Sequence, residues 1–402
     1  MPDIAVIGGG TPFTINLIHE MARQWAGLEQ LDVRLTGRRS HNTELVARYA
    51  AAAWSDCPGW QVRASASFED AVAGADLIIH QARFGGLQGR ASDEEFGAQW
   101  GVPADESLGP TGLRAALRLR RSTLDLTDRI AAHNPSAWIV PMTNPLSVTT
   151  QILARRLGDR VIGICDLPIH ALESIATLAA VPARNISYAY TGLNHRGFLY
   201  GINIGGMSLH GKMAQALRAK PLDWVDAQEF ADLDAMPMAY HKVVKGNSFR
   251  ESGRARHLAD ISDRALQQLA AAPQVFPSAL RERETPWYEK AVVPLTGALL
   301  GFGDFKGVLN LPGEEISRER LCVVAKGRVV PYQNPPVPPG VAAWTSRFGD
   351  HEHAVMHAVL TPSPESLKAC LEQDPICPGN AAEAIAKTLW DEFTAENGEQ
   401  DA

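Results

Sequence analysis

The chain has 402 residues, of which 45% are hydrophobic, so we expect two packed domains and no extensive disorder. Its formal net charge is −7 with both signs spread along the chain, and the lack of a basic stripe argues against a nucleic-acid partner. No apolar run approaches the ~18–20 residues that span a bilayer, and no signal peptide precedes the first strand candidate, so we expect a cytoplasmic protein with no membrane partner that acts on small molecules.

The first half of the chain alternates short apolar strand candidates with stretches of helical spacing. The strand candidates are Ile4–Ile7, Leu31–Leu35, Leu77–Ile79, Trp138–Met142 and Val161–Ile164. The helical stretches are Thr14–Ala26, Asn42–Ala53 and Leu113–Ala132. This alternation predicts an α/β fold with a doubly wound parallel sheet of the Rossmann type, and we place this dinucleotide-binding domain at residues 1–168.

The pattern changes after about residue 185. We expect strands at Ile186–Tyr190 and Phe198–Ile204, and helices at 227–247, 257–271 and 379–395. The proline-rich segment Pro331–Gly340 is typical of a surface loop, and the acidic tail after Glu396 is expected to fray. Residues 169–402 are therefore predicted to form an α+β domain for substrate binding and oligomerisation, which gives an architecture like that of lactate and malate dehydrogenases.

Three consecutive glycines, Gly8, Gly9 and Gly10, stand between the first strand candidate and the first helix. Glycines at such a turn let the backbone approach a pyrophosphate, and the helix N-terminus supplies N–H donors. We therefore expect Gly8, Gly9, Gly10, Thr11 and Phe13 to bind a dinucleotide, with Phe13 at the position of the usual third glycine.

The second strand candidate is followed by Gly37, Arg38 and Arg39. Enzymes that use NAD usually carry Asp or Glu here for the ribose, whereas guanidinium groups can hold a 2′-phosphate. Arg38 is therefore a candidate cofactor ligand, and the choice between NAD and NADP stays open. The alternative is that both arginines are solvated surface residues.

Polar residues also follow the later strand candidates, whose carboxyl ends should face one crevice. Asn144 is expected to bind a sugar or ribose hydroxyl, although Asn before proline is also a common turn residue. Cys165 ends the next strand and His195 follows about thirty residues later. A thiolate and an imidazole in one crevice can hold a divalent transition metal, and open positions would suit a substrate-chelating one.

Two further features suggest chemistry at this crevice. Arg83 and Arg90 lie in a glycine-containing segment after the third strand candidate, and paired arginines suggest an anionic ligand group. Tyr240 is expected to open a helix, and a neighbouring metal could lower the pKa of its phenol enough for it to act as a base.

The order of these motifs resembles that of glycoside hydrolase family 4 from Ile4 to about residue 260, and more weakly beyond. The matching series is Gly8–Gly10, Gln81, Arg83, Gly85–Gly86, Asp93–Glu94, Glu106, Gly109–Pro110, Thr143–Pro145, Cys165, Pro168 and Gly192–His195. Each motif alone is weak, but a chance match to the whole ordered series is improbable.

The resemblance implies an NAD-dependent, metal-dependent glycosidase. In this family, NAD oxidises C3 of the sugar, which acidifies the C2 proton and allows the C1 group to leave by elimination before water and the hydride return. Tyr240 matches the base that takes the C2 proton, and Cys165 and His195 match the ligands of Mn²⁺ or another divalent metal. The positions that match substrate-contacting residues are Arg90, Glu106, Asn144 and Arg254. A homodimer or homotetramer is also implied.

Asp166 bears on substrate choice. Members that cleave 6-phospho-β-glucosides typically carry Asn after the metal cysteine, whereas some α-cleaving members carry Asp as a proposed general acid. The short chain and the segment Gln81–Arg83 are instead similar to the β-cleaving members. The resemblance therefore implies a 6-phospho-β-glucosidase-like hydrolase with Asp166 as a catalytic acid, and it leaves the anomer and the need for the 6-phosphate open.

Two other functions fit the residues. A lactate/malate-type dehydrogenase would use His195 as acid and base on a small hydroxy acid and would need no metal. A non-catalytic nucleotide sensor would keep the Rossmann domain alone, although the combination of Cys165, His195 and Tyr240 argues against it.

Overall fold

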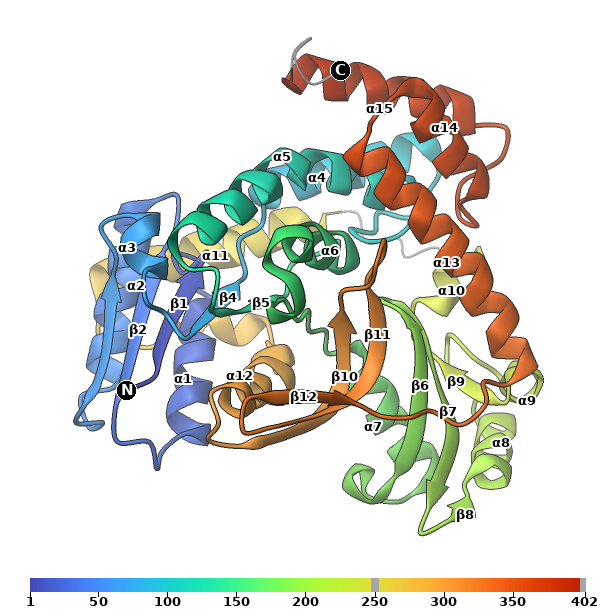
Figure 1. The fold of residues 1–402 in the computed structure, drawn as a ribbon, viewed down its shortest axis with the longest axis horizontal. Helices are drawn as coiled ribbons and strands as arrows, with labels where there is room; N and C mark the ends of the chain where they lie inside the picture. Colours follow the sequence, from blue (N-terminus) through green and yellow to red (C-terminus); the bar gives the residue numbers. More distant parts are fainter. Residues whose placement is uncertain (247–252, 398–402) are drawn as a thin grey trace.

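The computed structural model describes residues 1–246 and 253–397, which contain a parallel and an antiparallel sheet (Figure 1). The parallel sheet has the strand order β3-β2-β1-β4-β5. Its strands are β1 (Asp3–Ile7), β2 (Leu31–Thr36), β3 (Trp60–Ala64), β4 (Leu77–His80) and β5 (Trp138–Pro141). The intervening helices are α1 (Thr14–Gln24), α2 (Ser40–Ala53), α3 (Phe68–Val72), α4 (Gly86–Trp100), α5 (Gly109–His133) and α6 (Leu146–Leu157). The predicted Rossmann-type sheet is confirmed.

Strand β1 is covered on both faces, which explains its continuous apolar sequence. Ile4 and Val6 pack with α1 and α2 in one hydrophobic cluster. Ala5 and Ile7 point to the opposite face and pack with residues of α5 and α6 in another. Because both faces are buried, only the strand ends are open to a ligand.

The second sheet is antiparallel and has seven strands, with β10-β11-β6-β7-β8 as its main order, β12 paired with β11 and β9 paired with β7. Its strands are β6 (Ser187–Leu193), β7 (Arg196–Ile204), β8 (Met207–Ser208), β9 (Ala235–Pro237), β10 (Asp304–Leu311), β11 (Arg318–Ala325) and β12 (Arg328–Pro331). The helices of this half are α7 (Leu167–Ala179), α8 (His210–Ala219), α9 (Ala227–Leu233), α10 (His241–Val244), α11 (Arg254–Ala271), α12 (Val293–Leu299), α13 (Pro339–Leu360), α14 (Pro364–Gln373) and α15 (Ala382–Asn397). The predicted α+β character is confirmed.

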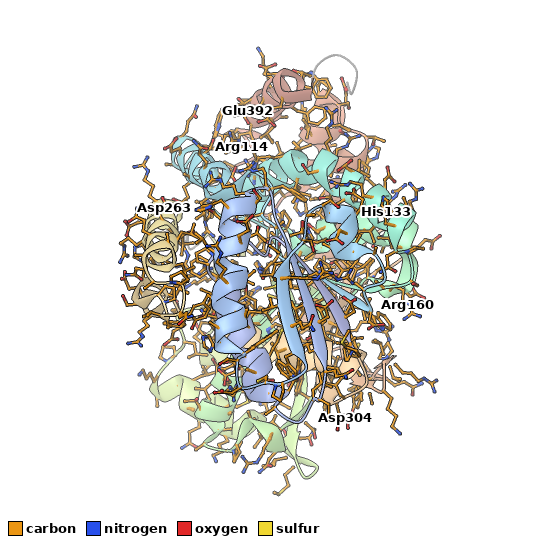
Figure 2. All side chains as sticks on the ribbon, turned by 90° about the vertical axis from the view of Figure 1, so that its left-hand side faces the viewer. Arg114, His133, Arg160, Asp263, Asp304 and Glu392 are labelled. Atoms are coloured by element: carbon orange, nitrogen blue, oxygen red, sulfur yellow. The ribbon has the colours of Figure 1, made fainter. Side chains whose placement is uncertain are left out.

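The last helices return to the first half of the chain. Figure 2 shows Arg114 of α5 beside Glu392 of α15, and their Nε and Oε2 atoms are 2.7 Å apart. Helices α11 and α12 likewise contribute Ile261 and Leu295 to the cluster that covers β1. The division of the chain at residue 168 stays a prediction.

Two predicted elements were wrong. Val161–Ile164 is not a strand, because it makes only single bridges, from Val161 to Ile139 and from Gly163 to Asn310 of the second sheet. The single helix expected at 227–247 is instead α9, β9 and α10, since Asp234 takes a left-handed conformation (φ 48°) that ends α9.

Other expectations concern loops, the tail and membranes. Residues 332–338 form no helix or strand, as expected for the proline-rich loop. The predicted fraying tail falls from residue 398 on, outside the described residues. Within 1–246 and 253–397, no helix has the length and apolar character needed to cross a membrane.

Candidate active site

A cavity of about 1570 Å³ lies at the carboxyl ends of the parallel strands and extends to the second sheet. It brings together nearly all the predicted site residues. Those that line it are Gly8, Gly10, Thr11, Phe13, Arg38, Arg90, Glu106, Asn144, Cys165, Asp166, His195, Tyr240 and Arg254. Gly9 is the exception: it does not line the cavity, and a Cβ there would lie 2.9 Å from the Leu35 Cβ, so this glycine allows close packing of the turn on β2.

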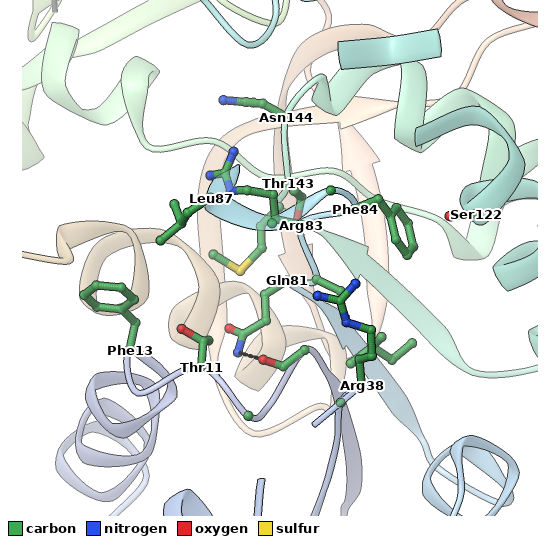
Figure 3. Close-up of a pocket in the computed structure, with 18 of the residues that line it drawn as sticks. Thr11, Phe13, Arg38, Gln81, Arg83, Phe84, Leu87, Ser122, Thr143 and Asn144 are labelled. Atoms are coloured by element: carbon green, nitrogen blue, oxygen red, sulfur yellow. Dashed lines mark hydrogen bonds between the residues drawn. The ribbon is translucent and has the colours of Figure 1, made fainter. Parts of the chain in front are cut away.

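The glycine turn between β1 and α1 forms one wall (Figure 3). Gly8 has φ +87°, and an added Cβ would lie 2.7 Å from the backbone nitrogen of Ala82. Gln81 holds the turn, because its side-chain amide donates to the Gly8 carbonyl at 3.3 Å and to the Thr14 hydroxyl at 2.7 Å. Because the turn carries no side chain at Gly8, its backbone forms the cavity wall there, and a pyrophosphate can approach the backbone N–H groups closely.

Cys165 and His195 reach the cavity from different elements. Cys165 precedes α7, and His195 lies in the two-residue turn between β6 and β7, with φ 66°. That turn is anchored from β11, since the Asn194 side-chain amide donates to Glu319 at 3.0 Å. The chain thus fixes a thiol and an imidazole at one site.

The chemistry of this pair fits a divalent transition metal. Burial lowers the pKa of His195, which keeps the imidazole neutral, and its buried Nδ1 has no hydrogen-bond partner among the described residues. Burial raises the pKa of the Cys165 thiol well above its ordinary value, and the charges of Asp166 and Glu319 add to the rise. A bound cation would offset these effects and favour the thiolate. Residues 1–246 and 253–397 hold no metal-binding group of three or more His, Cys, Asp or Glu, so coordination positions would be left for a substrate.

Tyr240 lies directly against His195. Its ring is stacked on that of His195. Burial raises the pKa of the Tyr240 phenol, and Asp105 and Cys165 raise it further, whereas Arg90 and Arg254 oppose the rise. Tyr240 is thus protonated in this geometry, and a nearby cation would be needed before it could act as a base.

Asp166 begins α7 beside the cysteine. Its Oδ1 is 3.9 Å from the Cys165 sulfur, and its Oδ2 is 3.1 Å from Nε2 of His170. The carboxyl group is therefore held by a side chain on its own helix while it borders the cavity. Asn144, in the segment between β5 and α6, borders the cavity as well.

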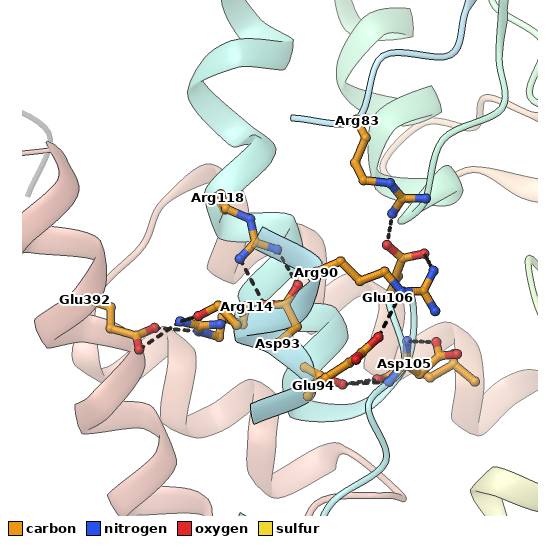
Figure 4. A network of polar contacts seen from close by, with 12 residues as sticks. Arg83, Arg90, Asp93, Glu94, Asp105, Glu106, Arg114, Arg118 and Glu392 are labelled. Carbon is orange, nitrogen blue, oxygen red and sulfur yellow. Dashed lines mark hydrogen bonds and ion pairs between the residues drawn. The ribbon is translucent and has the colours of Figure 1, made fainter. Parts of the chain in front are cut away.

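An arginine cluster occupies another side of the cavity and consists of Arg83, Arg90, Arg254 and Arg283. Glu106 pairs with Arg83 and also accepts a hydrogen bond from Arg90 at 2.8 Å (Figure 4). Burial, together with the charges of Arg90 and Arg283, lowers the pKa of Arg83 to about 9. Burial, with the charges of Arg254 and Arg90, lowers that of Arg283 to about 10, although Tyr288 opposes this shift. These arginines are half-buried or exposed, and Arg83 and Arg90 share the carboxylate of Glu106. Four guanidinium groups with that one shared carboxylate make this side of the cavity a candidate site for an anion.

Glu94 links this cluster to helix α11. Its carboxylate accepts hydrogen bonds from the backbone nitrogens of Gly253 and Ala255, each at 2.9 Å, and lies 3.3 Å from Nε of Arg90. Arg254 lies between the two bound nitrogens, so Glu94 fixes the start of the helix that carries it (Figure 4).

Arg283 and Asp105 were not recognised from the sequence as site residues. Arg283 lies in a loop, and its guanidinium packs over the rings of Phe13 and Trp287, at 4.5 and 4.9 Å. No local pattern marks such a position. Asp105 precedes the predicted Glu106, and that adjacency was the available signal.

Comparison with known proteins finds a family of glycosyl hydrolases and relatives named as 6-phospho-beta-glucosidases. Residues 3–181 match the model of the family described as family 4 glycosyl hydrolase. A probable 6-phospho-beta-glucosidase of Bacillus subtilis is 23% identical over 97% of this chain and 95% of its own length. The 6-phospho-beta-glucosidase BglT of Thermotoga maritima is 26% identical over 81% of this chain and 82% of its own.

Solved structures show the same fold. The T. maritima 6-phospho-beta glucosidase with NAD and glucose-6-phosphate has a TM-score of 0.84 at 23% identity, over 98% of both chains. A complex of that enzyme with manganese, NAD⁺ and glucose-6-phosphate also scores 0.84, at 24% identity over 98% of this chain and 99% of the other. Malate dehydrogenase of Cryptosporidium parvum scores 0.54 at 11% identity, over 90% of this chain and 99% of its own. The expected dehydrogenase-like architecture is thus confirmed.

Proposed function

We propose that this chain is a family 4 glycosyl hydrolase, which hydrolyses O-glycosidic bonds of 6-phosphorylated glucosides with the help of NAD and a divalent metal such as Mn²⁺. The observation that carries the proposal is that the arginine cluster, the Cys165–His195 pair and the glycine turn all line one cavity. The relatives named as 6-phospho-beta-glucosidases, and the complexes with NAD, manganese and glucose-6-phosphate, support it.

Different residues of the cavity would bind the dinucleotide, the metal and the sugar phosphate. Gly8, Gly10, Thr11 and Phe13 would hold the dinucleotide, and Cys165 with His195 would hold the metal. When bound, the dinucleotide supplies a hydride acceptor for the sugar and the metal supplies a Lewis acid for its oxygens. The arginine cluster would bind the 6-phosphate, while Asn144 would orient a sugar hydroxyl.

The proton transfers fall to two side chains. Tyr240 would accept the proton from C2 of the sugar at its phenolic oxygen. Asp166 would donate a proton to the glycosidic oxygen as the C1 bond breaks. His195 is buried and Tyr240 is half-buried with its ring stacked on it, so the phenol is held in place at the cavity wall. The anomer that is cleaved and the homodimer or homotetramer stay predictions.

The experiment uses p-nitrophenyl α- and β-glucosides, with and without a 6-phosphate, in the presence of Mn²⁺ and NAD or NADP. We expect nitrophenol release that requires metal, dinucleotide and phosphate, with no net formation of reduced nicotinamide. Failure to release nitrophenol, combined with steady reduction of the dinucleotide by a small hydroxy acid, would instead identify a dehydrogenase.

A further inference from the structure

We propose that Arg38 and Arg39 form a subsite for the 2′-phosphate of NADP, so that the chain binds NADP more tightly than NAD. The inference rests on the proposed function only in requiring a nicotinamide dinucleotide in the cavity. It concerns this chain's own residues at the end of β2, where the adenosine ribose lies in Rossmann domains.

The backbone places both arginines next to the glycine turn. The carbonyl of Thr36, the last residue of β2, accepts hydrogen bonds from the Gly8 and Gly9 nitrogens, both at 2.9 Å. A Cβ on Gly37 would lie 3.4 Å from the Gly10 nitrogen, so the segment after β2 runs against the turn. The next two residues, Arg38 and Arg39, are exposed and border the cavity. Figure 3 shows the Arg38 side chain extending from this edge toward the interior of the pocket.

The two guanidinium groups are available to a ligand. Within the described part of the chain, neither side chain makes a hydrogen bond or an ion pair. Residues 36–43 contain no Asp or Glu, so the end of β2 lacks the carboxylate that NAD enzymes usually place against the ribose 2′-hydroxyl. Paired guanidinium groups at that position match a phosphate instead.

The carboxylates elsewhere in this part of the cavity do not cancel the two positive charges. Glu44 of α2 lies 3.8 Å from Arg48, and Asp125 of α5 lies 3.8 Å from Arg129. Glu44 is thus nearest to Arg48, while Asp125 shares Arg129 with Glu69, whose Oε1 lies 2.7 Å from Nη2 of Arg129. Among the described residues, neither Glu44 nor Asp125 forms an ion pair with Arg38 or Arg39.

Ser65, which directly follows β3, adds a neutral donor. Its backbone nitrogen donates to the Leu35 carbonyl at 2.9 Å, which places it beside the end of β2. Its hydroxyl oxygen is buried with no hydrogen-bond partner in the described residues, and the residue borders the cavity. A hydroxyl at the same edge of the sheet can also donate a hydrogen bond to a phosphate oxygen.

The test is a binding measurement without sugar or turnover. Purified protein is titrated in a calorimeter with NAD⁺ and NADP⁺, and with 5′-AMP and 2′,5′-ADP, which differ only in the 2′-phosphate. We expect NADP⁺ to bind at least about tenfold more tightly than NAD⁺, and 2′,5′-ADP to bind at least about tenfold more tightly than 5′-AMP. One strong charge-assisted hydrogen bond to the 2′-phosphate would give a difference of this size. Equal affinities, or tighter binding of NAD⁺, would overturn the proposal.

Variants of the two arginines then test whether these residues cause the preference for NADP⁺. Arg38→Ala and Arg39→Ala should weaken NADP⁺ binding about tenfold or more and change NAD⁺ binding less than about threefold. Arg63→Ala is the matched control, because Arg63 is an exposed arginine of β3 that pairs with Asp70 and does not border the cavity. If the Arg38 and Arg39 variants lose both dinucleotides equally, the arginines do not read the 2′-phosphate. Selective binding without any glycoside cleavage would uphold the subsite and refute only the proposed hydrolase.

Discussion

The imidazole ring of His195 is stacked on the phenol ring of Tyr240, with centroids 4.3 Å apart and ring planes inclined by 28°. The contact arises because β9 pairs with β7, and the Met238 nitrogen donates to the Gly197 carbonyl at 2.9 Å. This pairing returns the chain to the turn that carries His195. The proposed metal ligand and the proposed base are thereby held together by backbone structure.

Tyr240→Phe keeps the stacked ring and removes the phenolic oxygen. We expect exchange of the sugar C2 proton to slow by about 10²–10⁴-fold, the range for loss of a general base. Exchange is measured by NMR in D₂O with the dinucleotide and Mn²⁺ present. Tyr332→Phe, which changes an exposed tyrosine, serves as the control. An unchanged exchange rate in Tyr240→Phe would exclude this residue as the base.

The first half of the site was predictable from the sequence because parallel strands end at one edge. Gly8, Asn144 and Cys165 each follow an apolar segment, so their meeting at the cavity required only the order of strands and helices.

The contact between Tyr240 and His195 was not predictable in this way. Residues 227–247 have helical spacing, but the left-handed Asp234 and the pairing of β9 with β7 interrupt the helix. Arg283 likewise takes its place from tertiary packing on Phe13 and Trp287. Long-range pairing of this kind leaves no local periodicity.

Cys165→Ser should remove the softest proposed ligand of the metal. We expect Mn²⁺ affinity, followed by electron paramagnetic resonance, to fall at least about a hundredfold while the thermal unfolding temperature changes little. Cys57→Ser is a suitable control, because Cys57 is half-buried and does not border the cavity. Wild-type affinity in the Cys165 variant would remove it from the ligand set.

Asp166→Asn should separate substrates by leaving group. An alkyl aglycone needs protonation as it departs, so its cleavage should slow by about 10²–10⁴-fold, whereas p-nitrophenol should be released within about tenfold of the wild-type rate. The rates are compared with those of Asp159→Asn, an exposed carboxyl group outside the cavity. Equal losses on both aglycones would deny Asp166 the role of acid.

Arg283→Ala should weaken recognition of the phosphate. The guanidinium is held between Phe13 and Trp287 and repelled by Arg254 and Arg90, so an anion should stabilise it. We expect the Kd of glucose 6-phosphate to rise by about 10–100-fold and that of glucose to change less than about threefold. Arg281→Ala, two residues away over Phe276 and outside the cavity, is the control. A similar loss for both sugars would place Arg283 outside the phosphate site.

His80, at the end of β4, should make the fold sensitive to acid. Burial lowers its pKa to about 4, and its Nδ1 has no hydrogen-bond partner among the described residues. The folded chain therefore keeps this imidazole neutral, whereas the unfolded chain binds a proton below about pH 6.5. Its contribution to stability is present above pH 6.5 and is lost as the pH falls toward 4, which amounts to about 2 kcal/mol between pH 7 and pH 5.

His80→Gln replaces the imidazole with an amide that does not titrate, so the difference in unfolding free energy between pH 7 and pH 5 should shrink by about 2 kcal/mol. Urea unfolding at the two pH values measures it. His133→Gln, which changes the exposed last residue of α5, should keep the wild-type difference. Other buried histidines also have a lowered pKa, among them His351, so some acid sensitivity should remain in the His80 variant. If His80→Gln keeps the full wild-type difference, protonation of His80 is not coupled to unfolding.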